Sequence, residues 1–223
     1  MTVTFVINVD LAKMKEQYVI LGGTFDPIHS GHLITANALA DKLGYDCVNL
    51  MPCGDAYHKQ GASSGVHRLA MLELALRNEP KLVVDSQELK RAGATYTVDT
   101  LFALRQKMGP EAHIVWAMGS DAAQSLARWH NWQTIFTLAN VIVVARNNDV
   151  PADLSHWPAK CVTDKNEFKR QPNGCYMLAV LPPVAVSSTQ IRLQVANQET
   201  VANHVPQSVI DYIEQHGLYR GEN

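Results

Sequence analysis

Two histidines stand three residues apart in the stretch GGTFDPIHSGHL, residues 22–33, and they are the first candidates for chemistry in this sequence. Residues at this spacing lie on the same side of a helix, so His29 and His32 can face one ligand if a helix begins near them. A helix start also presents unpaired backbone N–H groups and the positive end of the helix dipole. Imidazole and amide donors together suit a polyphosphate, because they can stabilise negative charge that develops during a reaction.

The residues before the histidines indicate how a ligand would reach them. Gly22 and Gly23 close an apolar run, and because glycine has no side chain, the backbone there can approach a ligand closely. The Asp-Pro pair that follows is a turn signal, and we expect a helix to begin within 30–32. A strand, a loop and a helix start in this order predict an anion site.

Other interpretations of the same stretch remain open from these residues alone. Two histidines near a helix start can be surface residues or helix caps. A zinc site is disfavoured because no third ligand of firm identity lies nearby. A hydride-transferring dinucleotide fold would need GxGxxG, and a Walker phosphate loop would need GK[ST]; the sequence supplies neither.

Six short apolar runs predict the strands that would carry such a site: 18–23, 47–52, 81–85, 113–119, 141–146 and 176–181. Each run is nearly continuous, which is typical of strands buried on both faces. Segments between them have helical spacing, as in Leu33, Ala36, Ala40 and Leu43, with Gly44 placed to end the helix. We therefore predict a single α/β domain with a Rossmann-like, doubly wound parallel sheet and helices on both faces.

Two further helices are predicted at 66–78 and 95–109, the second with Thr97 as a candidate N-cap and Gly109 as its stop. Ligands in such folds bind beyond the carboxyl ends of the strands. The predicted functional segments are therefore those that follow the runs: 22–32, 52–59, 85–96, 119–121, Arg146 and 187–192.

Two segments fall outside this alternation. Residues 147–174 carry three prolines, several charges and no clear period, which predicts a long surface excursion. Residues 1–17 are interpreted as an N-terminal extension, either disordered or the product of a start assigned too early, since Met14 stands just before the first run. The folded domain is expected to span 18–220.

Composition narrows the classes of partner. The 223 residues have a formal net charge of −2, which argues against a nucleic-acid binder that neutralises many phosphates. The four cysteines form no CxxC pair, as expected of reduced thiols in a cytoplasmic protein. No apolar stretch reaches the roughly 20 residues needed to cross a bilayer, so no membrane partner is expected. The sequence does not predict an oligomeric state.

The stretch GTFDPIHSGH resembles the HxGH signature of the nucleotidyltransferase superfamily. Together with RAGATYTVDTL, GSDAAQSLARW and VSSTQIR, it resembles the bacterial nicotinate-nucleotide adenylyltransferases, from about Tyr18 to Arg220. The resemblance implies an enzyme of NAD biosynthesis that transfers AMP from ATP to nicotinate mononucleotide, giving deamido-NAD and pyrophosphate. It further implies direct in-line attack by the acceptor phosphate, no covalent enzyme intermediate, and Mg²⁺ that arrives with ATP.

The site residues follow from the resemblance and from their places at strand ends. The expected catalytic residues are His29, His32 and Arg192, the last lying one helical turn after Ser188. The expected ATP-binding residues are Gly22, Gly23, Thr24, Phe25, His32, Lys59, Gly119, Arg146, Ser187, Ser188 and Arg192. The expected acceptor-binding residues are Tyr96, Thr97, Asp121 and Trp129, with the tryptophan stacked on the nicotinate ring. No residue is expected to bind a metal directly.

Two departures and three rival functions qualify this assignment. The chain has DAYHK at 55–59 where the family often has two prolines, and RNN at 146–148 where the family often has RPG. Both differences put the roles of Lys59 and Arg146 in doubt. The acceptor can instead be nicotinamide mononucleotide or, against the chain's length and motifs, pantetheine phosphate. A nucleotide sensor that binds without turnover is the rival from another class.

Overall fold

The computed structural model describes residues 17–54, 62–146, 153–181, 184 and 186–220 of the chain. The first strand begins at Gln17, one residue before the predicted start of the domain. The N-terminal extension, residues 1–16, lies outside the described residues, so both interpretations of it stay predictions.

A parallel sheet forms the centre of the molecule, and its strands appear in the order β3-β2-β1-β4-β5-β7-β6. All six predicted apolar runs form strands, and every neighbouring pair is parallel, as the sequence predicted. The strands are β1 (Gln17–Gly23), β2 (Val48–Pro52), β3 (Leu82–Val84), β4 (His113–Gly119), β5 (Asn140–Arg146), β6 (Lys160–Cys161) and β7 (Cys175–Leu181).

The strand order reverses between β1 and β4. The chain builds outward from β1 to β2 and β3, then returns to lay β4 against the other side of β1. Leu21 pairs with Leu50 of β2 on one side and with Ala117 of β4 on the other. The loops that follow β1 and β4 therefore flank a topological switch point, where open α/β sheets bind their ligands.

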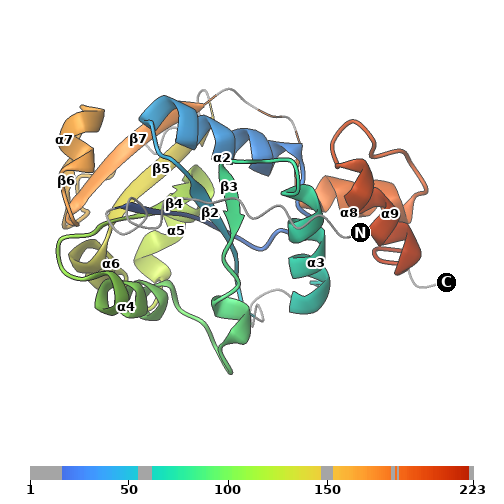
Figure 1. Cartoon of the computed structure of the whole chain (residues 1–223), viewed down its shortest axis with the longest axis horizontal. Helices are drawn as coiled ribbons and strands as arrows, with labels where there is room; N and C mark the ends of the chain where they lie inside the picture. The colour runs from blue at the N-terminus through green and yellow to red at the C-terminus, as the bar shows by residue number, and fades with distance from the viewer. Residues whose placement is uncertain (1–16, 55–61, 147–152, 182–183, 185, 221–223) are drawn as a thin grey trace, which may run out of the picture.

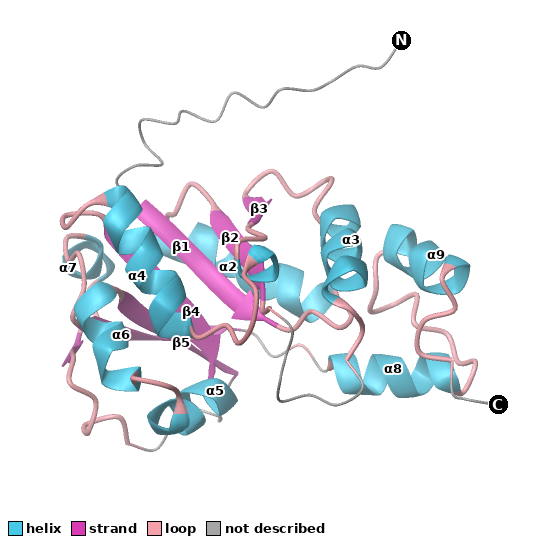
Figure 2. Ribbon diagram, turned by 90° about the horizontal axis from the view of Figure 1, so that it is seen from below, coloured by secondary structure: helices cyan, strands magenta, loops and turns pink. Residues whose placement is uncertain are grey.

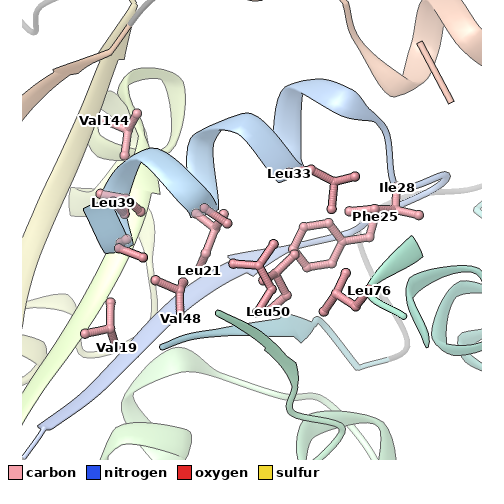
Figure 3. Packing of buried hydrophobic residues seen from close by; sticks show 14 of the residues in the cluster. Val19, Leu21, Phe25, Ile28, Leu33, Leu39, Val48, Leu50, Leu76 and Val144 are labelled. Carbon is pink, nitrogen blue, oxygen red and sulfur yellow. The ribbon is translucent and has the colours of Figure 1, made fainter. Parts of the chain in front are cut away.

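Helices cover both faces of the sheet (Figure 1). The elements besides the strands are α2 (Ser30–Leu43), α3 (Gly65–Ala75), η1 (Glu88–Lys90), α4 (Thr97–Met108), α5 (Ser120–Ser125), η2 (Leu126–Arg128), α6 (Trp132–Leu138), α7 (Lys165–Lys169), α8 (Ser188–Ala196) and α9 (Gln207–Gln215). Alternate residues of β1 divide between two cores: Val19 and Leu21 pack with α2 and α3, whereas Ile20 packs with α4 and α6. The first of these cores is shown in Figure 3.

The C-terminal helices lie beyond the sheet. Figure 2 shows the arrowhead of β1 directed toward the end of the molecule that holds α3, α8 and α9. The last two helices pack on the first core through Ile191, Val209 and Ile213. They therefore stand next to the edge at which parallel strands present their ligand-binding loops.

Helix boundaries agree with the sequence in most places. Gly44 ends α2 with a left-handed φ of 68°, and Gly109 follows the last residue of α4. The predicted N-cap of α4 is wrong by one residue: Tyr96 holds the extended capping position, and Thr97 is the first helical residue. None of the described helices is long and apolar enough to span a membrane.

The prediction of a surface excursion is wrong for its described part, residues 153–174. This segment adds β6 to the edge of the sheet, forms α7, and buries apolar side chains, namely Leu154, Trp157, Val162 and Phe168. A two-residue strand and a five-residue helix are too short to show a hydrophobic period, which is why the sequence did not predict them. Residues 147–152 lie outside the described part of the chain.

Candidate active site

The loop between β1 and α2 carries the predicted phosphate site. It runs from Thr24 to His29, and α2 begins at Ser30, within the predicted range. Phe25 has a left-handed backbone, with φ of 51°, and only 1% of the residue is exposed. Its ring packs in the core near Ile28 (Figure 3), so Phe25 can meet a ligand only through its backbone.

The two glycines that end β1 are closely covered by aromatic rings. A Cβ atom at Gly22 would lie 2.6 Å from the ring of Trp116, and one at Gly23 would lie 2.9 Å from the ring of Phe25. Real Cβ contacts are not this short, so a larger residue would displace one of these rings. The structure thus gives both glycines a packing role that the sequence did not predict.

The two histidines lie against each other at the start of α2. Their rings are stacked with centroids 3.7 Å apart, and the edge of Phe25 meets His32 at 5.0 Å. His29 is the N-cap residue, and its backbone N–H donates to Nδ1 of His32 over 3.3 Å. Since Nδ1 accepts a bond, the proton of a neutral His32 ring resides on Nε2, which becomes a donor.

Helix α8 docks its first turn onto the same loop. Ser187 caps the helix through a reciprocal bond with Gln190, while Ser188 Oγ donates to the carbonyl of Pro27 over 3.0 Å. The Arg192 guanidinium donates to the carbonyl of Asp26 over 2.7 Å. The start of α8 and the Arg192 guanidinium therefore meet the loop that leads into α2.

Asp26 holds this loop in place from inside. Its carboxylate accepts the Tyr219 hydroxyl at 2.6 Å and the Ser63 backbone N–H at 3.1 Å, and the residue is buried. Burial, and then the bond to Asp26, raise the pKa of Tyr219 above its ordinary value, so the phenol stays protonated and continues to donate. The C-terminal segment is thereby tied to the phosphate loop.

The junction between β4 and α5 lies across the switch point from the phosphate loop. Gly119 is exposed, and a Cβ there would meet no atom within 4 Å, so the backbone is open to a ligand. Helix α5 follows at once, with Asp121 exposed in its first turn. Ser120 fixes this turn by donating to the carbonyl of Val144 over 3.2 Å.

Two of the predicted acceptor residues, Tyr96 and Trp129, lie next to His130, and these three residues make up the aromatic surface. Tyr96 is 38% exposed and lies beside the ring of His130, with centroids 4.5 Å apart. Trp129 is half-buried and packs on the core beneath α4 and α6, following η2 rather than lying within a helix. Thr97 opens α4, so its backbone N–H belongs to the helix start.

Some predicted residues are not placed with the others. Lys59 lies outside the described residues. Arg146 is the last residue of β5 at the functional edge of the sheet, and its side chain is likewise outside the described part.

The structure adds residues that the sequence analysis missed: Asp26, Arg68, His130 and Tyr219. Of these, only Arg68 could have been noticed in the sequence, because it places a charge on the apolar side of its helix, one turn before Leu72.

The described residues offer no metal centre, and their hollow beside α9 is lined by none of the predicted site residues. Within the described ranges, no group of three His, Cys, Asp or Glu side chains is arranged to hold a metal ion. A hollow of about 740 Å³ lies between the end of α8 and α9, lined in part by Val201, Ile210 and Ile213. None of the predicted site residues lines it.

Comparison with known proteins identifies the family of the chain. Residues 20–194 match the family model described as cytidylyltransferase-like. The chain is 41% identical over 214 residues to a Hahella chejuensis protein named "Probable nicotinate-nucleotide adenylyltransferase", covering 92% of this chain and 96% of that one. It is 40% identical over 205 residues to a protein of the same name from Neisseria meningitidis serogroup C, covering 90% and 96%.

A solved structure has the same fold. The nicotinic acid mononucleotide adenylyltransferase of Plasmodium falciparum, complexed with NaAD, superposes with a TM-score of 0.69 at 19% identity, covering 92% of this chain and 97% of that one. At this identity the likeness concerns the fold, while the family rests on the sequence matches. The chain therefore belongs to the cytidylyltransferase-like family and, within it, to the nicotinate-nucleotide adenylyltransferases.

Proposed function

We propose that this adenylyltransferase transfers AMP from ATP to nicotinate mononucleotide, by direct attack of the acceptor's 5′-phosphate on the α-phosphorus. The main support is the convergence of the stacked imidazoles of α2 and of Arg192 of α8 on one loop, beside the switch point. Family membership gives the reaction class. The acceptor, the direct mechanism and the residue roles below are inferred.

The triphosphate lies at the start of α2 in this proposal. His32 donates from Nε2 to an α- or β-phosphate oxygen, and His29, which stacks on it, holds the ring in that orientation. Arg192 has five N–H donors; Nη1 donates to the Asp26 carbonyl over 2.7 Å and Nη2 to the Thr189 hydroxyl over 3.3 Å. Its remaining donors, with the N-terminal amides of α8, are available to the phosphates.

The acceptor approaches from the aromatic surface across the switch point. Trp129 stacks on the nicotinate ring, Tyr96 bounds the same pocket, and the backbone N–H of Thr97 reaches the ring carboxylate. Asp121 receives a ribose hydroxyl of one of the nucleotides. These roles rest on the family resemblance and on the placement of Tyr96 beside His130.

The transfer itself needs no enzyme nucleophile. One acceptor phosphate oxygen forms a bond to the α-phosphorus, the bond from that phosphorus to the bridging oxygen breaks, and pyrophosphate leaves with the electron pair. A phosphate monoester is already anionic at neutral pH, so positioning and charge stabilisation supply the catalysis. Magnesium would arrive as part of the ATP substrate and would supply positive charge at the phosphates, and none of this chain's residues is assigned to hold it.

The test is pyrophosphate release with MgATP and three acceptors measured in parallel: nicotinate mononucleotide, nicotinamide mononucleotide and pantetheine phosphate. We expect the highest kcat/KM with the acid nucleotide. A higher value with the amide would change the acceptor, and release with none of the three would favour the sensor. The cytoplasmic location and the absence of nucleic-acid and membrane partners stay predictions.

A further inference from the structure

Arg68 is a buried cation that the proposed chemistry does not use directly. It lies in the first turns of α3 with only 1% of its surface exposed, and it is the largest fully buried side chain of the described residues. Within those residues no carboxylate forms an ion pair with it. Burying a charge is costly unless it is well hydrogen-bonded, so its partners indicate its purpose.

The guanidinium donates to three backbone carbonyls, one in the β1–α2 loop and two at the opposite ends of the β2–α3 connection. Nη1 donates to Thr24 over 3.0 Å, Nη2 to Gly54 over 3.3 Å, and Nε to Ser63 over 3.1 Å. Thr24 follows β1 in the phosphate loop, Gly54 follows β2, and Ser63 precedes α3. A single rigid, planar group therefore joins the phosphate loop to both ends of the β2–α3 connection, at the carboxyl ends of the strands.

The Gly54 peptide is held from its other side as well. Its N–H donates to the carboxylate of Glu88, which is buried and also accepts the Thr100 hydroxyl over 2.8 Å. A Cβ on Gly54 would lie 2.6 Å from Thr95, the residue before Tyr96. The chain of contacts thus runs from the phosphate loop through Arg68 and Gly54 to Thr95. Thr95 directly precedes Tyr96, which belongs to the aromatic surface.

We propose that Arg68 is a positioning residue. It fixes the spacing between the phosphate loop and the segment that leads into α4 through Thr95 and Tyr96, so that the two nucleotides meet in line. This inference rests on the proposed function. Arg68 touches neither nucleotide in this scheme. Each nucleotide keeps its own contacts when Arg68 is changed, and only their relative placement is lost.

Arg68→Lys is the first test, because lysine keeps the charge but cannot reach three carbonyls with a planar fork. We expect kcat to fall about 10- to 100-fold, as misplacement of about 1 Å can cost, with KM for each nucleotide changing less than about threefold. Arg68→Gln buries no charge and serves as the second variant if the lysine variant unfolds. It should show the same split between kcat and KM.

Arg105→Lys is the matched control. Arg105 also donates to several carbonyls, among them Leu138 at 3.0 Å and Pro172 at 2.8 Å. These carbonyls lie just before β5 and β7, at the amino ends of the strands. The site lies at the opposite, carboxyl ends. Both lysine variants should lose stability, whereas only the Arg68 variant should lose turnover.

Hydrogen exchange gives a readout that does not depend on turnover. In Arg68→Lys, and not in Arg105→Lys, the amides of 22–28 should exchange at least about tenfold faster, because local opening of that loop becomes easier. Equal exchange and equal kcat losses in the two variants would overturn the inference. A wild-type protein that releases no pyrophosphate, yet shows the exchange difference, would refute the proposed function and leave the role of Arg68 standing.

Discussion

Replacing His32 with alanine separates catalysis from folding more sharply than any other change at this site. The side chain accepts a hydrogen bond from the His29 backbone N–H, and at 3.3 Å this bond is long for its type. Losing a capping bond costs about 0.5–2 kcal/mol of stability, and this geometry points to the lower end. Domains of this size have about 5–15 kcal/mol in reserve, so His32→Ala should remain folded.

The expected loss in catalysis is larger. If Nε2 of His32 donates to charge that grows on the phosphates, removing it costs about 2.7–4 kcal/mol of transition-state stabilisation, or roughly 10²–10³ in kcat. The assay is pyrophosphate release with both nucleotides saturating, alongside thermal unfolding of the same preparation. A fall of less than tenfold in a folded variant would refute the assigned role.

His67→Ala is the matched control for this prediction. His67 is the third residue after its N-cap in α3, as His32 is in α2. Its ring instead faces α9, where Nδ1 lies 3.0 Å from the Tyr212 hydroxyl. We expect His67→Ala to lose some stability and to keep kcat near the wild-type value. Equal losses in both variants would mean that the effect of His32→Ala comes from the helix start in general.

Three further predictions test other parts of the site and fold. Tyr219→Phe removes the 2.6 Å bond to Asp26, so urea unfolding should show a loss of about 1.5–3 kcal/mol, with weaker ATP binding by calorimetry. Trp129→Ala should raise KM for the acceptor by about tenfold, from a stacking energy of about 1–3 kcal/mol, and leave KM for ATP unchanged. Burial lowers the pKa of His113 below 6.5, so its contribution to stability is present above pH 6.5 and declines on acidification, by up to about 1.4 kcal/mol per pH unit. His113→Gln should flatten that decline in unfolding titrations.

Strands and the position of the site could be predicted because their signals are local. Buried parallel strands read as continuous apolar runs, and a strand end followed by a helix start marks the functional edge. The same locality explains the failures. No local pattern shows that the Phe25 ring is buried in the core, which leaves only the backbone of Phe25 for the predicted ATP contact. Segment 153–174 forms β6 by pairing with β7, and no local sequence pattern shows this long-range contact.

Residues that act through loop carbonyls were the least predictable. Asp26 and Tyr219 are far apart in the sequence, and their bond depends on the C-terminal segment returning to the first loop. Arg68 interrupts the apolar side of α3 one turn before Leu72, which is a sign of a buried cation but does not identify its partners. Every residue carries a backbone carbonyl, so the residue types in the sequence do not show which carbonyls will accept these hydrogen bonds.

The choice of carbonyls as partners has an electrostatic consequence for ATP. Arg68 is bonded to Thr24 and Arg192 to Asp26 through carbonyl oxygens, and within the described residues neither guanidinium forms an ion pair. A carbonyl satisfies the N–H donors without cancelling the positive charge, whereas a carboxylate would cancel it and repel the triphosphate. Before ATP binds, the protein therefore keeps the Arg192 cation at this loop at some cost to its stability, whereas the buried Arg68 acts on the spacing of the loops. Binding of the triphosphate removes that cost, so ATP should stabilise the fold by more than the neutral contacts at the site would provide.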